Sequence, residues 1–160
     1  MAVIGISCDN NSISYVVVDE KTDSPKILEC ETYHFETNAK GELLDSAKYR
    51  IETVVKTHKI KKAAVLVVDT AYGKGQNTNT HPVKHQIEGV ILHSFYKQGI
   101  LFTEYNRKKL KSTLQKKLNG FKKTDDVKDF IKGNYAEECG RGNIKNDDQR
   151  EAFAIALTQL

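Results

Sequence analysis

The chain has 160 residues, a formal net charge of +4 and a hydrophobic fraction of 39%. This hydrophobic fraction is too high for a disordered chain. Because domains contain roughly 100–200 residues, residues 1–160 are expected to form a single domain. No run of about 18 apolar residues occurs, so no membrane-spanning helix is expected. The N-terminal residues lack the basic and apolar segments of a secretory signal, so none is expected there.

The three cysteines, Cys8, Cys30 and Cys139, are odd in number and lie far apart in the sequence. They form no CxxC pair, which argues against a zinc ribbon and against a disulfide framework. A reducing cytoplasm is therefore the expected compartment.

Three antiparallel strands are predicted near the N-terminus. Residues 2–9 and 12–19 are largely apolar and are joined by Asn10 and Asn11, a residue type that tolerates the positive φ angles of tight turns. A third strand is expected over residues 27–35, because short connections favour an antiparallel arrangement. Alternation along this strand places one set of side chains on a common face: Ile27, Glu29, Glu31, Tyr33 and Phe35.

The pattern then changes to alternating helices and strands. Apolar residues at helical spacing predict a helix over residues 43–55. The continuous apolar run of residues 63–69 predicts a strand that is covered on both faces. Thr124 is a candidate N-cap for a short helix over residues 124–132, and residues 133–146 are expected to form a loop. Helices are also expected over residues 81–97, 105–119 and 147–160, with a short strand over residues 100–104.

This order of elements, βββ-α-β-α-β-α-α-α, predicts an α/β protein with a five-stranded mixed sheet and helices on both faces. Residues 2–9 are expected at the centre of the sheet, beside residues 63–69. The order of the elements is that of the ribonuclease H-like fold.

Acidic residues occur at two positions where active sites commonly form in such a sheet. Asp69 ends the most apolar strand, and α/β sheets form sites at the carboxyl ends of their strands. Its alternative role is to cap the turn that follows. Asp147, Asp148 and Glu151 begin the last predicted helix, and the three-residue spacing of Asp148 and Glu151 places them on one helix face. Acidic residues at a helix N-terminus can also serve only to stabilise the helix dipole.

The first predicted strand carries two further polar candidates. Alternation places Ser7 and Asp9 on the same face as Val3 and Gly5, and it places Ile4, Ile6 and Cys8 on the other face. Glycine in a strand often marks the close approach of another backbone. Asp9 can also be a simple turn residue before Asn10.

Basic residues are concentrated between residues 97 and 123, where only Glu104 is acidic. A local excess of this kind is typical of phosphate binding, although cations opposite a leucine stripe can also form an ordinary solvated helix face. Tyr72 and Lys74 follow Asp69, and an aromatic side chain there can stack on a nucleic-acid base. The nine basic residues are Lys97, Arg107, Lys108, Lys109, Lys111, Lys116, Lys117, Lys122 and Lys123.

Five segments, in the same order along the chain, resemble the RuvC-type Holliday junction resolvases of the ribonuclease H-like superfamily. They are VIGI with Tyr15 eight residues after Ser7, VVDTAYGK, HQIEGVIL, Tyr105 with Lys111, and Asp148 and Glu151 followed by AFAIAL. The chain resembles a divergent member of this family. The resemblance implies a metal-dependent endonuclease that acts on branched or structured DNA during recombination. It also implies a two-fold homodimer.

The resemblance also implies a site. Two Mg²⁺ (or Mn²⁺) ions would be held by Asp69, Asp148 and Glu151, together with Asp9 or Ser7, and carboxylate oxygens suit such hard ions. Lys111 would help to neutralise the charge that develops on the phosphate. The nucleic acid would be held by Tyr72, Lys74, Arg107, Lys108, Lys109, Lys116 and Lys117.

Position 7 departs from the family pattern. The family has a metal-binding aspartate here, in a stretch of the form GIDPG, whereas this chain reads GISCD with Ser7 at that position. A serine hydroxyl is a poor ligand for Mg²⁺ beside a carboxylate. Three hypotheses therefore stand: an enzyme in which Asp9 substitutes for the missing ligand, a catalytically degenerate nucleic-acid-binding protein, and an interaction protein with no nucleic-acid role.

Overall fold

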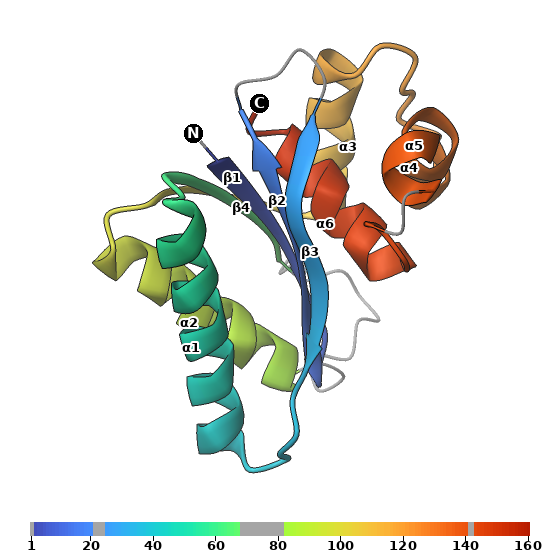
Figure 1. Cartoon of the computed structure of the whole chain (residues 1–160). Coiled ribbons are helices and arrows are strands. Elements are labelled where there is room, and N and C mark those ends of the chain that lie inside the picture. The colour runs from blue at the N-terminus through green and yellow to red at the C-terminus, as the bar shows by residue number, and fades with distance from the viewer. Residues whose placement is uncertain (1, 21–24, 68–81, 141–142) are drawn as a thin grey trace.

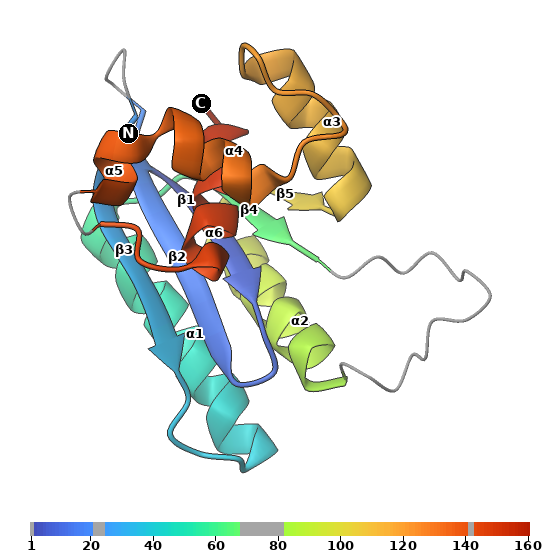
Figure 2. The ribbon, with the colours of Figure 1, turned by 90° about the vertical axis from the view of Figure 1, so that its right-hand side faces the viewer.

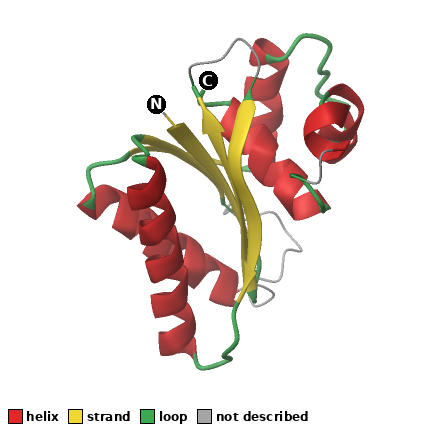
Figure 3. Ribbon diagram, in the orientation of Figure 1, coloured by secondary structure: helices red, strands yellow, loops and turns green. Residues whose placement is uncertain are grey.

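The computed structural model describes residues 2–20, 25–67, 82–140 and 143–160. A five-stranded sheet lies between two helical layers, with α1 and α2 on one face and α6, backed by α3 to α5, on the other (Figures 1 and 3). The strands are β1 (Ala2–Cys8), β2 (Ser12–Asp19), β3 (Lys26–His34), β4 (Lys62–Leu66) and β5 (Leu101–Tyr105). The helices are α1 (Lys40–His58), α2 (Pro82–Lys97), α3 (Arg107–Lys117), α4 (Val127–Asn134), α5 (Ala136–Gly140) and α6 (Asp147–Leu157).

The strands follow the order β3-β2-β1-β4-β5, which confirms the predicted mixed sheet with its first strand at the centre. β1 pairs with β2 antiparallel and with β4 parallel, and β4 pairs with β5 parallel. The short turn after β1 permits an antiparallel hairpin, whereas the parallel partner β4 requires the crossover that α1 provides. In the described part of the chain, no helix has the length and apolar character needed to cross a membrane.

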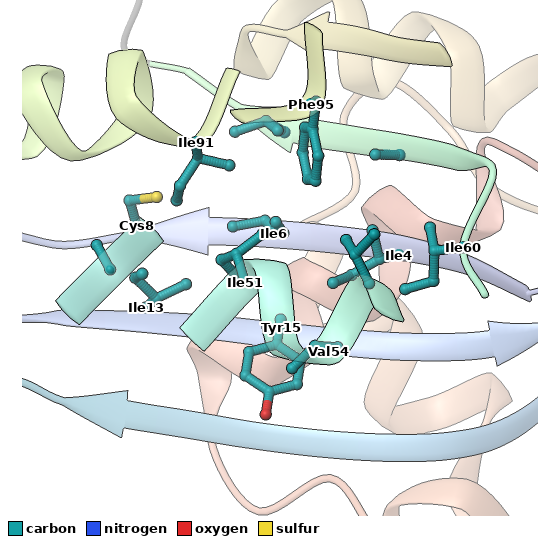
Figure 4. Close-up of a cluster of buried hydrophobic side chains, with 14 of the residues drawn as sticks. Ile4, Ile6, Cys8, Ile13, Tyr15, Ile51, Val54, Ile60, Ile91 and Phe95 are labelled. Carbon is teal, nitrogen blue, oxygen red and sulfur yellow. The ribbon is translucent and has the colours of Figure 1, made fainter. Parts of the chain in front are cut away.

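Alternation along β1 divides the core into two clusters, as predicted. Ile4, Ile6 and Cys8 pack under α1 and α2, where Ile51 and Phe95 join the same cluster (Figure 4). The alternate residues of β1 face α6, which lies against β1 and β2 (Figure 2). The buried polar residue Ser7 therefore lies on the α6 face.

Gly5 allows α6 to approach β1. A Cβ atom at this position would lie 2.1 Å from the carbonyl oxygen of Ala152 and 2.5 Å from the backbone nitrogen of Ala156. These are backbone atoms, so any larger residue would have to displace the helix. The close approach of α6 brings the helix face that carries Glu151 to the end of β1.

One face assignment on β3 was wrong. The register shifts between Val17 and Val18, which pair with Glu29 and Ile27, so Leu28 is an extra residue in a β-bulge. Because a bulge adds one residue to the strand, the side chains before it lie on the opposite face of the sheet from the one that simple alternation predicts. Ile27 therefore packs on the α6 side of the sheet, whereas Glu29 faces α1.

The structure also corrects several predicted boundaries. Tyr105 belongs to β5, and α3 begins after Asn106, whose side chain accepts the N–H of Lys109. Thr124 is not the cap of α4, because the carboxylate of Asp126 accepts the N–H groups of Lys128 and Asp129 and fixes the start of the helix there. The segment expected to be a loop contains α5, α6 ends at Leu157, and β4 ends at Leu66 rather than at residue 69.

Candidate active site

A buried hydrogen bond joins the end of β1 to α6. The hydroxyl of Ser7 donates to Oε2 of Glu151 over 3.1 Å, and the two residues are only 5% and 8% exposed. The residues are far apart in the sequence and meet because Gly5 lets α6 pack on β1. Where the family resemblance implies a metal-binding carboxylate, this chain has a hydroxyl donor that adds no negative charge.

A cation lies at the outer side of the same carboxylate. Nη2 of Arg107, the first residue of α3, is 3.7 Å from Oε1 of Glu151. The Arg107 side chain is 76% exposed, whereas the Glu151 side chain is 10% exposed. One oxygen of Glu151 therefore faces a buried hydroxyl and the other faces a guanidinium at the surface.

A second set of hydrogen bonds fixes the N-terminus of α6. The side chains of Asn146 and Gln149 both donate to Oγ1 of Thr32 on β3, over 3.0 and 3.2 Å. Because a hydroxyl oxygen has two lone pairs, Thr32 is left to donate its own proton to Ser14 on β2, 2.8 Å away. Asn146 also caps the helix by accepting the N–H of Gln149. The helix turn that precedes Glu151 is therefore bonded to β3 and, through Thr32, linked to β2.

These anchoring residues were missed in the sequence analysis. The signal was present in part, because Asn146 and Gln149 have the three-residue spacing of a helix cap. Ser14 lies opposite Ser7 on β1 and opposite Thr32 on β3, so three polar residues form one row across the sheet. That row becomes visible only when the register of the strands is known.

The remaining acidic candidates are more exposed. Asp148 is exposed at the start of α6. Asp9 is exposed just beyond β1, where its Oδ1 accepts the N–H of Asn10 over 2.8 Å, as expected of a turn residue. Asp147 pairs with Arg150 at 2.5 Å. Within residues 2–20, 25–67, 82–140 and 143–160, no three His, Cys, Asp or Glu side chains gather closely enough to hold a metal ion.

Asp69, Tyr72 and Lys74 lie outside the described residues. The predicted convergence of the Asp69, Asp148 and Glu151 carboxylates therefore stays a prediction. Glu151 has the donor chemistry that a hard divalent cation prefers, because its carboxylate supplies oxygen ligands. Its oxygen Oε1 faces outward, toward the exposed side chain of Arg107, which a cation can displace.

The basic residues of α3 are mostly at the surface. Lys108, Lys109, Lys116 and Lys117 are exposed like Arg107. Lys109 is engaged within the molecule, because its Nζ donates to the carbonyl oxygen of Glu104 and lies 5.1 Å from the centre of the Tyr105 ring.

Lys111, by contrast, is only partly exposed and lies near the N-cap of α4. The pKa of the Asp126 carboxyl is lowered, first by the hydrogen bond from the backbone of Asp129 and also by the charge of Lys111. The charge of Lys111 therefore acts on Asp126, the N-cap residue of α4.

Comparison with protein families gives one match over nearly the whole chain. A model described as crossover junction endodeoxyribonuclease RuvC matches residues 3–159. A search of curated proteins gave no significant match.

Solved structures show the same fold at low sequence identity. Thermus thermophilus RuvC superposes with a TM-score of 0.74 at 17% identity, covering 99% of this chain and 92% of that one. T. thermophilus RuvC in complex with a Holliday junction substrate has the same TM-score and coverage at 20% identity. The yeast mitochondrial Holliday junction resolvase Ydc2 has a TM-score of 0.65 at 15% identity, covering 98% of this chain and 76% of that one. These likenesses confirm the predicted ribonuclease H-like fold.

Proposed function

Because the chain belongs to the crossover junction endodeoxyribonuclease RuvC family, we propose that it is a divalent-metal-dependent endonuclease that acts on branched DNA. Members of this family are nucleases of this kind, and the T. thermophilus relative is known in complex with a Holliday junction. The structural observation that supports the proposal is the buried Glu151 carboxylate beside the end of β1, with a basic helix at its outer side.

Asp69, Asp148 and Glu151 are proposed to hold the ion, with Asp9 as a further candidate ligand. Mg²⁺ and Mn²⁺ both suit oxygen ligands; when bound, such an ion would activate a water molecule for attack on the phosphorus and stabilise the leaving oxygen. Ser7 orients the Glu151 carboxylate through its hydrogen bond. The anchoring of α6 by Thr32 limits the movement of that carboxylate.

The exposed cations of α3 are proposed to bind the DNA backbone. Phosphate contacts by lysine and arginine position a nucleic acid without reading its sequence. Lys111 is proposed to help neutralise the phosphate that is cut. Two symmetric cuts in a junction require two sites, so we also propose a homodimer. The proposed DNA-binding residues are Tyr72, Lys74, Arg107, Lys108, Lys109, Lys116 and Lys117.

A second candidate function is supported by Ser7. Because Ser7 stands where the family has a metal-binding aspartate, and its hydroxyl donates to Glu151, the site carries less negative charge for holding metal ions. A protein of this kind would bind branched DNA without cutting it.

A cleavage assay on a four-way DNA junction with Mn²⁺ separates the two functions. For the enzyme, the unmodified protein cuts the junction and Glu151→Gln, which keeps an acceptor for Ser7, lowers the rate at least tenfold. Ser7→Asp adds a ligand and should raise the rate more than tenfold, or about 1.4 kcal/mol of barrier. Ser7→Ala, which adds no carboxylate, is the matched control.

Binding without cutting, followed by cutting in Ser7→Asp, would identify the degenerate binding protein instead. Failure of every variant to bind the junction would contradict both candidate functions.

A further inference from the structure

The two partners of Glu151 differ in how firmly they hold it. Ser7 and Glu151 are both buried, so their hydrogen bond is part of the core. Arg107 reaches Glu151 from the surface, over a longer distance of 3.7 Å and with three-quarters of its side chain in solvent. Because the Arg107 guanidinium keeps most of its contact with solvent, its pairing with the buried Glu151 carboxylate is weak and easily broken. Oε1 of Glu151 is therefore paired with a side chain, that of Arg107, which another cation can displace.

The position of Arg107 in α3 is not explained by the stability of the helix. Arg107 is the first residue of α3, and the N-terminus of a helix is the positive end of its dipole, where a cation is unfavourable. The first turn of α3 contains no acidic residue that could compensate. Among the described residues, the ion pair with Glu151 on α6 is a favourable interaction for this guanidinium.

The backbone that carries Arg107 is fixed, although the side chain is exposed. Asn106 caps α3 by accepting the N–H of Lys109 over 2.8 Å, and its carbonyl oxygen accepts the N–H of Leu110 over 2.9 Å. The preceding residue, Tyr105, is buried in β5. Only rotation of the Arg107 side chain is needed to move the guanidinium away from Glu151.

We propose that Arg107 and a divalent cation compete for the Glu151 carboxylate, so that Arg107 acts as an internal counter-ion that limits metal binding. The inference rests on the proposed function, because it concerns the same carboxylate. A guanidinium and a divalent cation repel each other, and both would approach the oxygen Oε1 that faces outward. The metal binds fully only when the Arg107 side chain has turned away.

Direct titration with Mn²⁺, without DNA, tests this competition. The concentration of free Mn²⁺ is followed by electron paramagnetic resonance in the unmodified protein and in Arg107→Gln. Removal of the competing guanidinium should tighten Mn²⁺ binding about two- to fivefold, the range expected for a weak ion pair whose cation lies mostly in solvent. Arg107→Lys keeps a positive charge and should restore most of the weaker binding.

Lys108→Gln is the matched control, because it removes one charge from the neighbouring exposed position of α3. It should change Mn²⁺ affinity by a smaller factor, through general charge alone. Thermal unfolding of Arg107→Gln should stay close to that of the unmodified protein, since the side chain is exposed.

Equal effects of Arg107→Gln and Lys108→Gln would overturn the competition while leaving a metal-dependent function in place. If no variant binds Mn²⁺, both the competition and the proposed metal-dependent function are overturned.

Discussion

The hydroxyl of Ser7 decides how the Glu151 carboxylate is oriented, because it donates to that carboxylate inside the core. Aspartate at the same position would place two carboxylates close together, and their repulsion would be relieved by a bound cation or by protonation of one of them. With Ser7, the Glu151 carboxylate has a hydrogen-bond donor on one side and Arg107 on the other, so its attraction for a metal ion is weaker than beside a second carboxylate. This is why both candidate functions depend on position 7.

A second polar cluster lies on the opposite face of the sheet and fastens α1 to β2 and β3. Arg50 on α1 contacts Tyr15, Glu29 and Glu31, and its guanidinium lies 5.6 Å from the centre of the Tyr15 ring. Tyr15 donates to Glu29 over 2.6 Å, and His58 contacts the other oxygen of Glu29 at 2.6 Å. Burial, followed by the hydrogen bond and the charge of Glu29, raises the pKa of the Tyr15 hydroxyl well above its usual value.

This cluster predicts a dependence of stability on acid pH. Burial acts to raise the pKa of the Glu29 carboxyl. Hydrogen bonds from Tyr15 and His58, together with the charges of His58 and Arg50, act in the opposite direction and outweigh burial, so this pKa lies below its usual value of 4.5. A carboxyl whose pKa is lower in the folded state stabilises the fold above pH 4.5 and loses this contribution as the pH falls through the folded pKa.

Glu29→Gln should therefore flatten the decrease in the free energy of unfolding below pH 4.5, as measured by urea denaturation at a series of pH values. Glu36→Gln, at an exposed position after β3, is the control and should keep the slope of the unmodified protein. An unchanged slope in Glu29→Gln would contradict the stabilising role of this carboxylate.

At the scale of single elements, α6 is the helix that builds the site. Its buried face packs on β1 and β2, and its N-terminus is tied to Thr32 through Asn146 and Gln149. The position of Glu151 therefore depends on the distance between α6 and β1, which Gly5 sets.

Gly5→Ala should destabilise the protein by about 1–3 kcal/mol or more, because the added Cβ would overlap backbone atoms of Ala152 and Ala156. Urea denaturation measures this loss as a lower midpoint. Gly89→Ala in α2 is the control: a Cβ there meets nothing within 4 Å, and alanine should stabilise the helix by roughly 0.5–1 kcal/mol. A Gly5→Ala protein with an unchanged midpoint would contradict the close packing of α6.

The elements show what sequence patterns could and could not predict. The strands and most helices followed from local periodicity, because alternation in β1 and the leucine spacing in α3 are properties of neighbouring residues. The bulge at Leu28 was missed because it is defined by pairing with β2. The cap at Asp126 was missed because Thr124 is an equally plausible capping residue when only the sequence is known.

The candidate site was predicted only in part, for the same reason. The helix face shared by Asp148 and Glu151 follows from their spacing, but the contact of Glu151 with Ser7 depends on the packing of α6 on β1. Arg107 was predicted as a DNA-binding residue, and its contact with Glu151 depends on how α3 lies beside α6. The ligand roles of Asp9, Asp69, Asp148 and Glu151 and the catalytic role of Lys111 stay predictions.

At the scale of the whole molecule, exposed cations are concentrated on one helix, α3. The exposed lysines of α3 lie on the same side of the sheet as Glu151, whereas α1 and α2 cover the other side (Figure 1). The path of DNA along α3 stays a prediction, which this arrangement favours. The single domain and the homodimer stay predictions at this scale.

Replacing Lys108 and Lys116 together by alanine should weaken junction binding and reduce the slope of log K against log salt by about two units, since each phosphate contact contributes roughly 0.9. Fluorescence anisotropy at a series of salt concentrations measures this slope. Lys40→Ala with Lys56→Ala removes the same charge from α1, on the other side of the sheet, and should leave the slope nearly unchanged. Equal slopes for the two double variants would remove α3 from the path of the DNA.

A crystal structure of the protein grown with Mn²⁺ would show whether the Glu151 carboxylate holds a divalent cation. Anomalous scattering from Mn²⁺ locates the ion independently of any assumption about its ligands. We expect an anomalous peak within about 2.5 Å of a Glu151 carboxylate oxygen, with the Arg107 guanidinium displaced from its present distance of 3.7 Å. Crystals that contain Mn²⁺ elsewhere, or nowhere, while Arg107 remains beside Glu151 would contradict the account.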